Sequence, residues 1–519
     1  METNQTAPKT MAAMIVAIYA VIVAFHLGNA MAGKSLYRPI HLGTALNYAN
    51  APIDLLRPVI VGFTANEAPA AEEFPAWQAA AGSVFKLTGS RWYGWANLVS
   101  LLIFATGIWP FFQLARQYAG ESIAWWATTF FLAEPLIILM AGFGSTDGFS
   151  LVLTIWFLFF TDKMVRLGKW WYWFPASFFG AWAAVTKLPF FMSAGLCSVL
   201  LLLLNRIQTW QRWGLLASSG GVAAVVFFAW NHHTAALAAQ AEYPFYELRI
   251  SHSPHIAYWF FGDLRLRLDP VVWMRGAWRF LHGTMGSLPM SVLFIIGLFK
   301  RGNLLAKGWL VATFLTTLVF ANVVLVHWHY YLMCCPAVAI LCGTTLSEWE
   351  ELWSQRIRFR VLGLCLAGLA LGLSAIDGII TTKVAIYYDT YPKQMAAIIA
   401  QNTTAQDKLV VYGGDWGGEE LFRAGRRGFY VYEVQNLPGV STMKGLRELL
   451  SSPADVARLK ELGYTKLVLM SESPVRFAAV ASNPGSKRKR VFYPEKISDI
   501  ADGWPTLYKS EDIQIKEIR

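Results

Sequence analysis

The sequence predicts an α-helical polytopic membrane protein of about eleven spans, with a long first outer loop and a small C-terminal α/β domain outside the membrane. Two observations support this fold class. Hydrophobic residues make up 55% of the 519 residues and charged residues only 15%, with a mean hydropathy of +0.40. Apolar runs with few charges also recur along the chain, as the hydrocarbon interior of a bilayer requires.

Eleven apolar runs can be counted, several of them shorter than the roughly 20 residues of an upright span. They lie near residues 11–31, 95–115, 122–142, 148–161, 171–186, 189–205, 214–231, 288–299, 308–326, 332–346 and 361–380. The first run is longer than the core of a typical signal peptide, and an imperfect cleavage site follows it. We therefore expect it to be retained as the first span.

Among the short connections between the runs, lysine and arginine are concentrated in every second one. The connections after the even-numbered runs carry Arg116, Lys163, Arg166, Lys169, Arg206, Arg212, Lys300, Arg301, Arg356, Arg358 and Arg360. The positive-inside rule then predicts a multi-pass protein of the plasma (inner) membrane, with a cytoplasmic N-terminus and a periplasmic or extracellular C-terminal domain. This distribution explains the net charge of +11. Nucleic acid is not expected as a partner, because no basic helix or RNA-binding motif accompanies the charge.

Three long segments fall on the predicted outer side: residues 32–94, about 232–287, and everything after about 385. All nine histidines lie in that half of the protein: His26, His41, His232, His233, His252, His255, His282, His327 and His329. Polar chemistry gathered on one face indicates that the protein works at that face.

The C-terminal segment differs in character from the rest of the chain. "YPKQMAAIIAQN" and "SPADVARLKELG" predict helices, the second with a cap at Ser451 or Ser452 and a stop at Gly463. "DKLVVYGG" and "TKLVLMSE" predict short buried strands. Alternating helices and strands favour a small α/β domain. We therefore predict a transmembrane domain at residues 1–385 and an extracytoplasmic α/β domain at 386–519.

The first outer loop contains "AEEFPAW", which places Glu72 and Glu73 just before Pro75. The apolar residues that follow are spaced for an amphipathic helix that begins at Pro75 and ends at Gly89. The two carboxylates then occupy the N-terminal edge of this helix. Either they only complement the helix dipole, or one of them acts as a base or ion ligand above the membrane.

Further candidates lie at the outer ends of spans. Asp147 in "GSTDG" either caps the next helix or takes part in chemistry. Lys187 in "VTKLPF" either snorkels to the interface or binds a phosphate. His327 and His329 lie beside Tyr330 in "VHWHYY", where an aromatic belt explains the tyrosine but not the two histidines. Glu134, inside the third run, is costly in a bilayer, so we expect it to meet a basic group.

In their order and sidedness these residues resemble the polyprenyl-phosphate-sugar-dependent glycosyltransferases of the GT-C superfamily, such as the protein O-mannosyltransferases and lipid A aminoarabinose transferases. The matching positions are Glu73 with Pro75, Gly89, Asp147, Thr186 with Lys187, and "HWHYYLMCCP" from His327 to Pro336. The resemblance covers roughly residues 10 to 385. It implies a GT-C-like membrane domain and a membrane glycosyltransferase activity.

One departure from the family concerns an Asp shortly after the first span, which is often taken as the catalytic base or its metal partner. This chain has "YRPIHLGTA" there, with His41 where the acid is expected. Either His41 takes that role at a near-neutral pKa, or Glu73 carries it alone. The departure also weakens the transfer of a metal requirement, so a divalent cation as cofactor is left open.

The resemblance implies transfer of a sugar from a polyprenyl phosphate to a lipid, glycan or protein acceptor at the outer face, with inversion. Glu73 is the first candidate for the base and His41 the second, with Asp147 as a further catalytic residue. The candidates for binding the lipid phosphate are Lys187 and Arg38, with Arg265 and Arg267 in reserve. The candidates for contacting substrate are His252, His255, His327, His329 and Tyr330.

Two other classes of protein compete with this hypothesis. A transporter or lipid flippase would place charges near the bilayer midplane and often shows an inverted repeat, and the sequence has few such charges and no evident repeat. A membrane anchor that only displays the C-terminal domain would not need the acidic outer loop. Membrane lipids are expected partners under all three hypotheses.

Overall fold

The structure is a computed structural model that describes residues 6–29, 38–60, 62, 64–69, 71, 73–90, 92–204, 209–240, 242, 254–353, 357–383, 391–412, 419–431, 446–470, 503–510 and 512–518. The chain divides into two compact units. Unit 1 comprises residues 1–30, 93–230 and 257–383, and unit 2 comprises 31–92, 231–256 and 384–519. This grouping differs from the predicted boundary at 385/386, because the first outer loop and residues 231–256 join the C-terminal segment.

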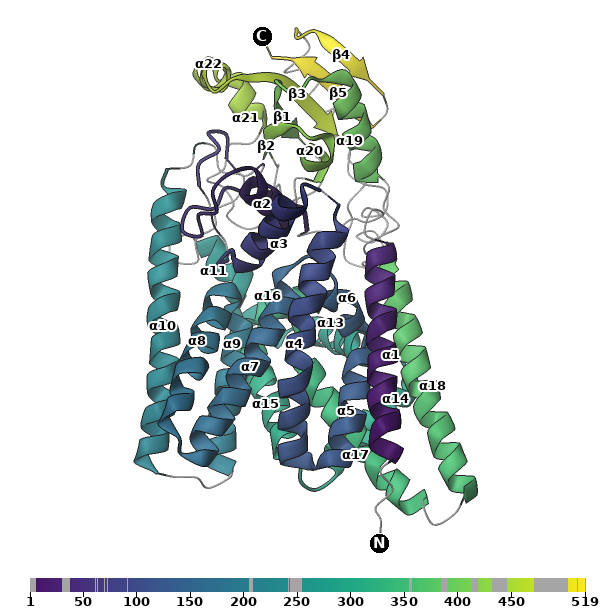
Figure 1. The fold of residues 1–519 in the computed structure, drawn as a ribbon. Coiled ribbons are helices and arrows are strands. Elements are labelled where there is room, and N and C mark those ends of the chain that lie inside the picture. The colour runs from purple at the N-terminus through teal and green to yellow at the C-terminus, as the bar shows by residue number, and fades with distance from the viewer. Residues whose placement is uncertain are drawn as a thin grey trace. The chain divides into compact units, whose positions relative to one another are not determined.

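Unit 1 is helical wherever the structure gives it regular secondary structure (Figure 1). Each of the eleven apolar runs coincides with a helix or a pair of helices. The elements are α1 (Thr6–Gly28), α4 (Gly94–Ala119), α5 (Glu121–Ala133), α6 (Pro135–Ala141), α7 (Thr146–Leu167), η1 (Trp170–Tyr172), α8 (Trp173–Thr186), α9 (Leu188–Leu204), α10 (Trp210–Ala238), α11 (Pro254–Phe261), α12 (Leu264–Leu268), α13 (Pro270–Phe280), η2 (Leu281–Met285), α14 (Leu288–Phe299), α15 (Leu304–Val319), α16 (Ala321–Val326), η3 (Trp328–Cys334), α17 (Cys335–Trp353) and α18 (Ile357–Thr382). Helix α10 continues from unit 1 into unit 2.

Among the described residues, six helices are long and apolar enough to cross a membrane, and counting each of two bent helix pairs as one span raises this number to eight. The chain is therefore a multi-pass membrane protein. Helices α9 and α15 are apolar but shorter. The predicted total of eleven spans and the predicted orientation of the termini stay predictions.

Both bent pairs have a local cause. Helices α5 and α6 meet at 68° because Glu134 is extended (φ −66°, ψ 136°) and Pro135 opens α6 without an amide hydrogen to donate. The segment 270–285 meets α14 at 103°, after the π-helical turn η2 and Gly286 at φ +62°. Helix α6 leads directly into the turn before α7, so the first bend directs the chain toward Asp147.

The two helices of the first outer loop, which belong to unit 2, form a tight pair. Helix α2 (Arg38–Asn50) packs against α3 (Ala76–Thr88), and a Cβ atom on Gly82 would lie 2.6 Å from the carbonyl oxygen of Ala45. The predicted amphipathic helix is confirmed, with Pro75 at its N-cap and Gly89 in the left-handed conformation at its C-cap (φ +61°). This conformation favours glycine, because a side chain there meets the backbone.

The C-terminal part of unit 2 is an α/β fold, as predicted. Its elements are α19 (Tyr391–Asn402), β1 (Lys408–Tyr412), α20 (Glu419–Ala424), β2 (Arg427–Val431), α21 (Leu446–Ser451), α22 (Pro453–Glu461), β3 (Tyr464–Met470), β4 (Thr506–Lys509) and β5 (Ile513–Glu517). The strand order is β2-β1-β3-β5-β4; β1 is parallel to β2 and β3, whereas β5 is antiparallel to β3 and β4. Ser452 caps α22 and Gly463 ends its turn at φ +85°, so both sequence predictions are confirmed.

Two apolar layers cover the sheet because side chains alternate along each strand. Leu409 and Val411 of β1 pack with α19 and α20, whereas Val410 and Tyr412 pack with α21 and α22. The basic run "SKRKR" at 486–490 lies outside the described residues.

Gly148 offers a test of the packing that precedes the candidate site. A methyl group there would collide with the carbonyl oxygen of Met140, so Gly148→Ala should destabilise the protein by about 1–3 kcal/mol, as overpacking does. Thermal unfolding of the detergent-solubilised protein measures the effect. Gly195→Ala on α9, where a methyl group meets nothing within 4 Å, is the matched control. Equal melting temperatures for the two variants would contradict this packing.

Candidate functional site

Asp147 lies in the first turn of α7, at the end of the buried turn that follows α6. Ser145 is the N-cap, and its Oγ accepts a hydrogen bond from the amide of Asp147 at 3.4 Å. The side chain of Asp147 is therefore not the helix cap. Asp147 is only 3% exposed, and burying a carboxylate is costly unless a positive group pairs with it.

Lys187 supplies that partner from the break between α8 and α9. It is the C-cap of α8, with extended φ and ψ, and its Nζ lies 3.2 Å from Oδ1 of Asp147. The same ammonium lies 5.4 Å from the ring centroid of Tyr330, a cation–π distance. Only 12% of the lysine side chain is exposed. Lys187 is therefore held inside the bundle rather than snorkelling to the surface.

The segment "VHWHYY" completes this cluster from η3. His329 Nε2 lies 3.9 Å from the same Asp147 oxygen, and its ring is 4.9 Å from that of Tyr330. The rings of His327 and His329 are 5.1 Å apart. Four predicted site residues from three distant segments of the sequence, Asp147, Lys187, His329 and Tyr330, thus form one group, with His327 at its edge.

The electrostatic environment keeps His327 neutral. Burial lowers the pKa of its imidazole to about 3, and the neighbouring positive groups of His329 and Lys187 act in the same direction. Asp147 opposes them without reversing the shift. His327 is therefore suited to offer a neutral hydrogen-bonding ring rather than a positive charge.

In unit 2, His41 lies on α2 and is 5% exposed. Its Nδ1 is 2.9 Å from the side-chain nitrogen of Gln78 on α3, and its ring meets Trp77 edge-on at 6.1 Å. Nδ1 of His41 is therefore already hydrogen-bonded to Gln78, with the donor and the acceptor set by the tautomer of the ring and the orientation of the amide.

Glu73 lies just before α3, two positions ahead of the N-cap Pro75, and is half-buried. It lies outside the first turn of the helix, while its neighbour Glu72 lies outside the described residues. Gln78 was missed from the sequence. Its signal was a glutamine on the apolar face of the amphipathic helix, next to the buried Trp77.

The remaining arginine and histidine candidates are not brought into either group by the contacts described. Arg267 donates hydrogen bonds to the carbonyl oxygens of Phe261, Leu318 and Val319, so it ties α11 and α15 together. Arg265 is exposed on α12. Arg38 begins α2 and His255 belongs to α11, but their side chains, and all of His252, lie outside what the structure describes.

Glu134 does not meet the basic group expected for it within the described part of the chain. It is fully buried, and the ionisable groups that interact with it are the thiols of Cys334, Cys335 and Cys342. The described residues also include no group of three or more His, Cys, Asp or Glu side chains that could hold a metal ion. Asp147, the buried acid of the cluster, already faces an ammonium group.

No protein-family model matches this sequence, and no curated protein matches it. Its fold does match solved structures. ArnT from Cupriavidus metallidurans bound to undecaprenyl phosphate aligns with a TM-score of 0.61 and 15% identity over 98% of each chain. The Archaeoglobus fulgidus oligosaccharyltransferase aligns with a TM-score of 0.50 and 10% identity, over 89% of this chain and 69% of that one.

A third structure, the arabinofuranosyltransferase AftD from Mycobacteria, aligns with a TM-score of 0.56 and 16% identity. The alignment covers 97% of this chain and 40% of AftD. These three proteins are GT-C glycosyltransferases. The chain thus has the GT-C fold that its sequence motifs predict, at identities that establish the fold alone.

The neutral state of His327 predicts how stability depends on pH. The imidazole of His327 binds a proton near pH 6.5 in the unfolded chain but only near pH 3 in the folded chain. The protein therefore loses stability as the pH falls through this interval. Between pH 7 and pH 5 the loss from this residue should be about 2 kcal/mol.

Thermal unfolding of wild type and His327→Asn across this range measures the loss. The variant should show a shallower fall in melting temperature between pH 7 and pH 5. His232→Asn, which removes an exposed imidazole from α10, is the control and should follow the wild type. Parallel curves for wild type and His327→Asn would contradict the buried neutral ring.

Proposed function

We propose that this protein is a membrane glycosyltransferase that moves a sugar from a polyprenyl-phosphate donor to an acceptor hydroxyl at the outer face of the membrane. The observation that carries the proposal is the buried cluster of Asp147 and Lys187 with His329 and Tyr330 at the start of α7. The GT-C fold supports the same class of reaction, and ArnT has been captured with undecaprenyl phosphate.

Lys187 is assigned to the phosphate of the donor. When the bond between the anomeric carbon and the phosphate oxygen breaks, its electron pair stays on that oxygen and the phosphate gains negative charge. A fixed ammonium in a water-poor site stabilises this charge without having to reorganise. Asp147 holds the ammonium in place through the 3.2 Å contact, and the ring of Tyr330 limits its movement.

Glu73 is assigned as the base. The acceptor oxygen attacks the anomeric carbon from the side opposite the phosphate while its proton passes to the carboxylate, so the configuration inverts. The contact with Gln78 favours Glu73 in this role, because Nδ1 of His41 is already hydrogen-bonded to it. His41 is assigned instead as a hydrogen-bonding contact to substrate, with His327 and His329 as further substrate contacts.

The assignment of the base is tested by Glu73→Gln, which keeps the shape of the side chain and removes its ability to accept a proton. The kcat for sugar transfer should fall about 10²–10⁴-fold with a smaller change in KM. Glu121→Gln, at an exposed position in the first turn of α5, is the matched control. Full activity of Glu73→Gln would move the base elsewhere. Solute or lipid transport by vesicles containing a protein that never transfers sugar would favour the transporter class.

The assignment of the donor is tested by mass spectrometry of the lipids that co-purify with the protein. Wild type should carry a polyprenyl phosphate or its glycosylated form, and Lys187→Ala should lose most of it because the phosphate has lost its cation. Lys86→Ala, which removes an exposed lysine from α3, is the control. Equal retention of the lipid by all three proteins would contradict the role of Lys187.

A further inference from the structure

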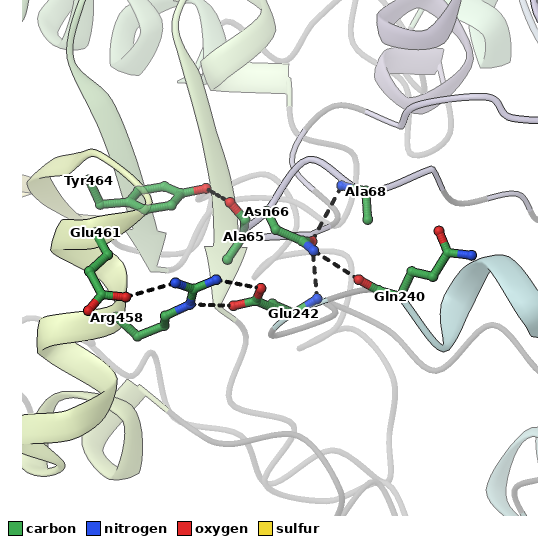
Figure 2. Close-up of polar contacts among 8 residues, drawn as sticks. All are labelled: Ala65, Asn66, Ala68, Gln240, Glu242, Arg458, Glu461 and Tyr464. Atoms are coloured by element: carbon green, nitrogen blue, oxygen red, sulfur yellow. Dashed lines mark hydrogen bonds and ion pairs between the residues drawn. The ribbon is translucent and has the colours of Figure 1, made fainter.

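Polar contacts join three segments of unit 2 that are far apart in the sequence (Figure 2). Asn66 of the first outer loop accepts a hydrogen bond from the amide of Glu242 at 3.1 Å and donates one to the carbonyl oxygen of Gln240 at 2.8 Å. The amide of Ala65 donates to the carbonyl oxygen of Glu242 at 2.9 Å. The loop therefore has a fixed register against the chain that follows α10.

The C-terminal α/β fold makes hydrogen bonds to both of these segments. Arg458 of α22 donates two hydrogen bonds to the Glu242 carboxylate, at 2.8 and 2.9 Å, and a third to Glu461 at 2.7 Å (Figure 2). The hydrogen bond from Arg458 lowers the pKa of Glu242, so the pair stays charged at neutral pH. The hydroxyl of Tyr464 on β3 donates to the carbonyl oxygen of Ala65 at 2.7 Å.

A second set of contacts attaches the same loop to the edge of the sheet. The carbonyl oxygen of Gly62 accepts a hydrogen bond from the amide of Tyr430, which extends the sheet beyond β2. Glu67 pairs with Arg427 of β2 and with Lys408 of β1. Burial alone would raise the pKa of Glu67, but its hydrogen bond to Arg427 and the two positive charges lower it.

Apolar contacts support this attachment, since Ile60 belongs to one core of the α/β fold and Ala65 to the other. The attached stretch leads in both directions to candidate site residues. Asn47 at the end of α2 donates to the carbonyl oxygen of Val59 at 2.8 Å, and α2 carries His41. Five residues separate Glu67 from Glu73.

We propose that the C-terminal α/β domain acts as a clamp that fixes the described residues between 59 and 71 of the first outer loop, and that Arg458 and Glu242 are positioning residues for Glu73. The effect on turnover rests on the proposed function, whereas the ordering of the loop does not. Neither residue need touch a substrate. The clamp orders the loop before substrate arrives, so the carboxylate loses less conformational freedom during the reaction.

Charge exchange tests the clamp more sharply than neutralisation, because an exposed ion pair alone contributes little and like charges repel. Arg458→Glu places three carboxylates together and should open the contact. Hydrogen–deuterium exchange of peptides that cover residues 59–71 should become about tenfold faster. The kcat for sugar transfer should fall about tenfold, with KM within about twofold of wild type.

The doubly exchanged chain, Glu242→Arg with Arg458→Glu, should recover the exchange rate and kcat to within about twofold of wild type. Lys460→Glu, an equal charge change at an exposed position of the same helix, should alter neither. Unchanged exchange in Arg458→Glu, or failure of the folded double variant to recover, would overturn the clamp. If hydrogen exchange follows this pattern but the wild-type protein transfers no sugar, the clamp is supported and the proposed function is contradicted.

Discussion

The buried ion pair between Asp147 and Lys187 is the interaction on which the arrangement of unit 1 around its site depends. Each charge alone would be costly to desolvate, so removing either partner leaves the other uncompensated inside the bundle. The pair joins the start of α7 to the break between α8 and α9. Tyr330 and His329 of η3 then close around it, so three segments of the chain meet at one pair of charges.

This arrangement suits the departure of an anionic group. The ammonium of Lys187 is already largely shielded from water and oriented by Asp147, and the nearby N-terminus of α7 adds the partial positive charge of its free amide groups. An arriving phosphate would share Lys187 with Asp147 rather than having to draw it from water. In the proposed reaction, the free energy needed to desolvate and orient Lys187 is therefore supplied during folding rather than during binding. The strongest electrostatic contact with the phosphate then develops as the phosphate leaves.

Much of the fold follows from local signals in the sequence. The apolar runs predict their helices because composition alone drives them into a bilayer, and Pro75 and Gly89 delimit α3 because each residue restricts the backbone in a specific way. The strands β1 and β3 were visible as buried runs. The grouping of unit 2 had no such signal, since the contact of Gly62 with Tyr430 joins residues that are hundreds of positions apart and uses only backbone atoms.

The candidate site was predictable to a similar extent. Asp147, Lys187, His329 and Tyr330 each stood out as polar or aromatic groups at the ends of apolar runs, and the fold brings them together. The role of Arg267 could not be read from the sequence, because its charge indicates a ligand whereas its hydrogen bonds are to backbone carbonyls. The surroundings of Glu134 could not be predicted either, because an acidic residue in an apolar run does not indicate that the groups packed around it are thiols.

The attachment of Gly62 to β2 also affects how the protein avoids misassembly. An uncovered edge strand offers its amide and carbonyl groups to any other extended chain, and it is a common starting point for aggregation. Here a segment from the distant N-terminal part of the same polypeptide occupies part of that edge. The C-terminal fold made without residues 59–71 would present β2 unprotected and be prone to self-association, so this loop also protects the sheet from pairing with other chains.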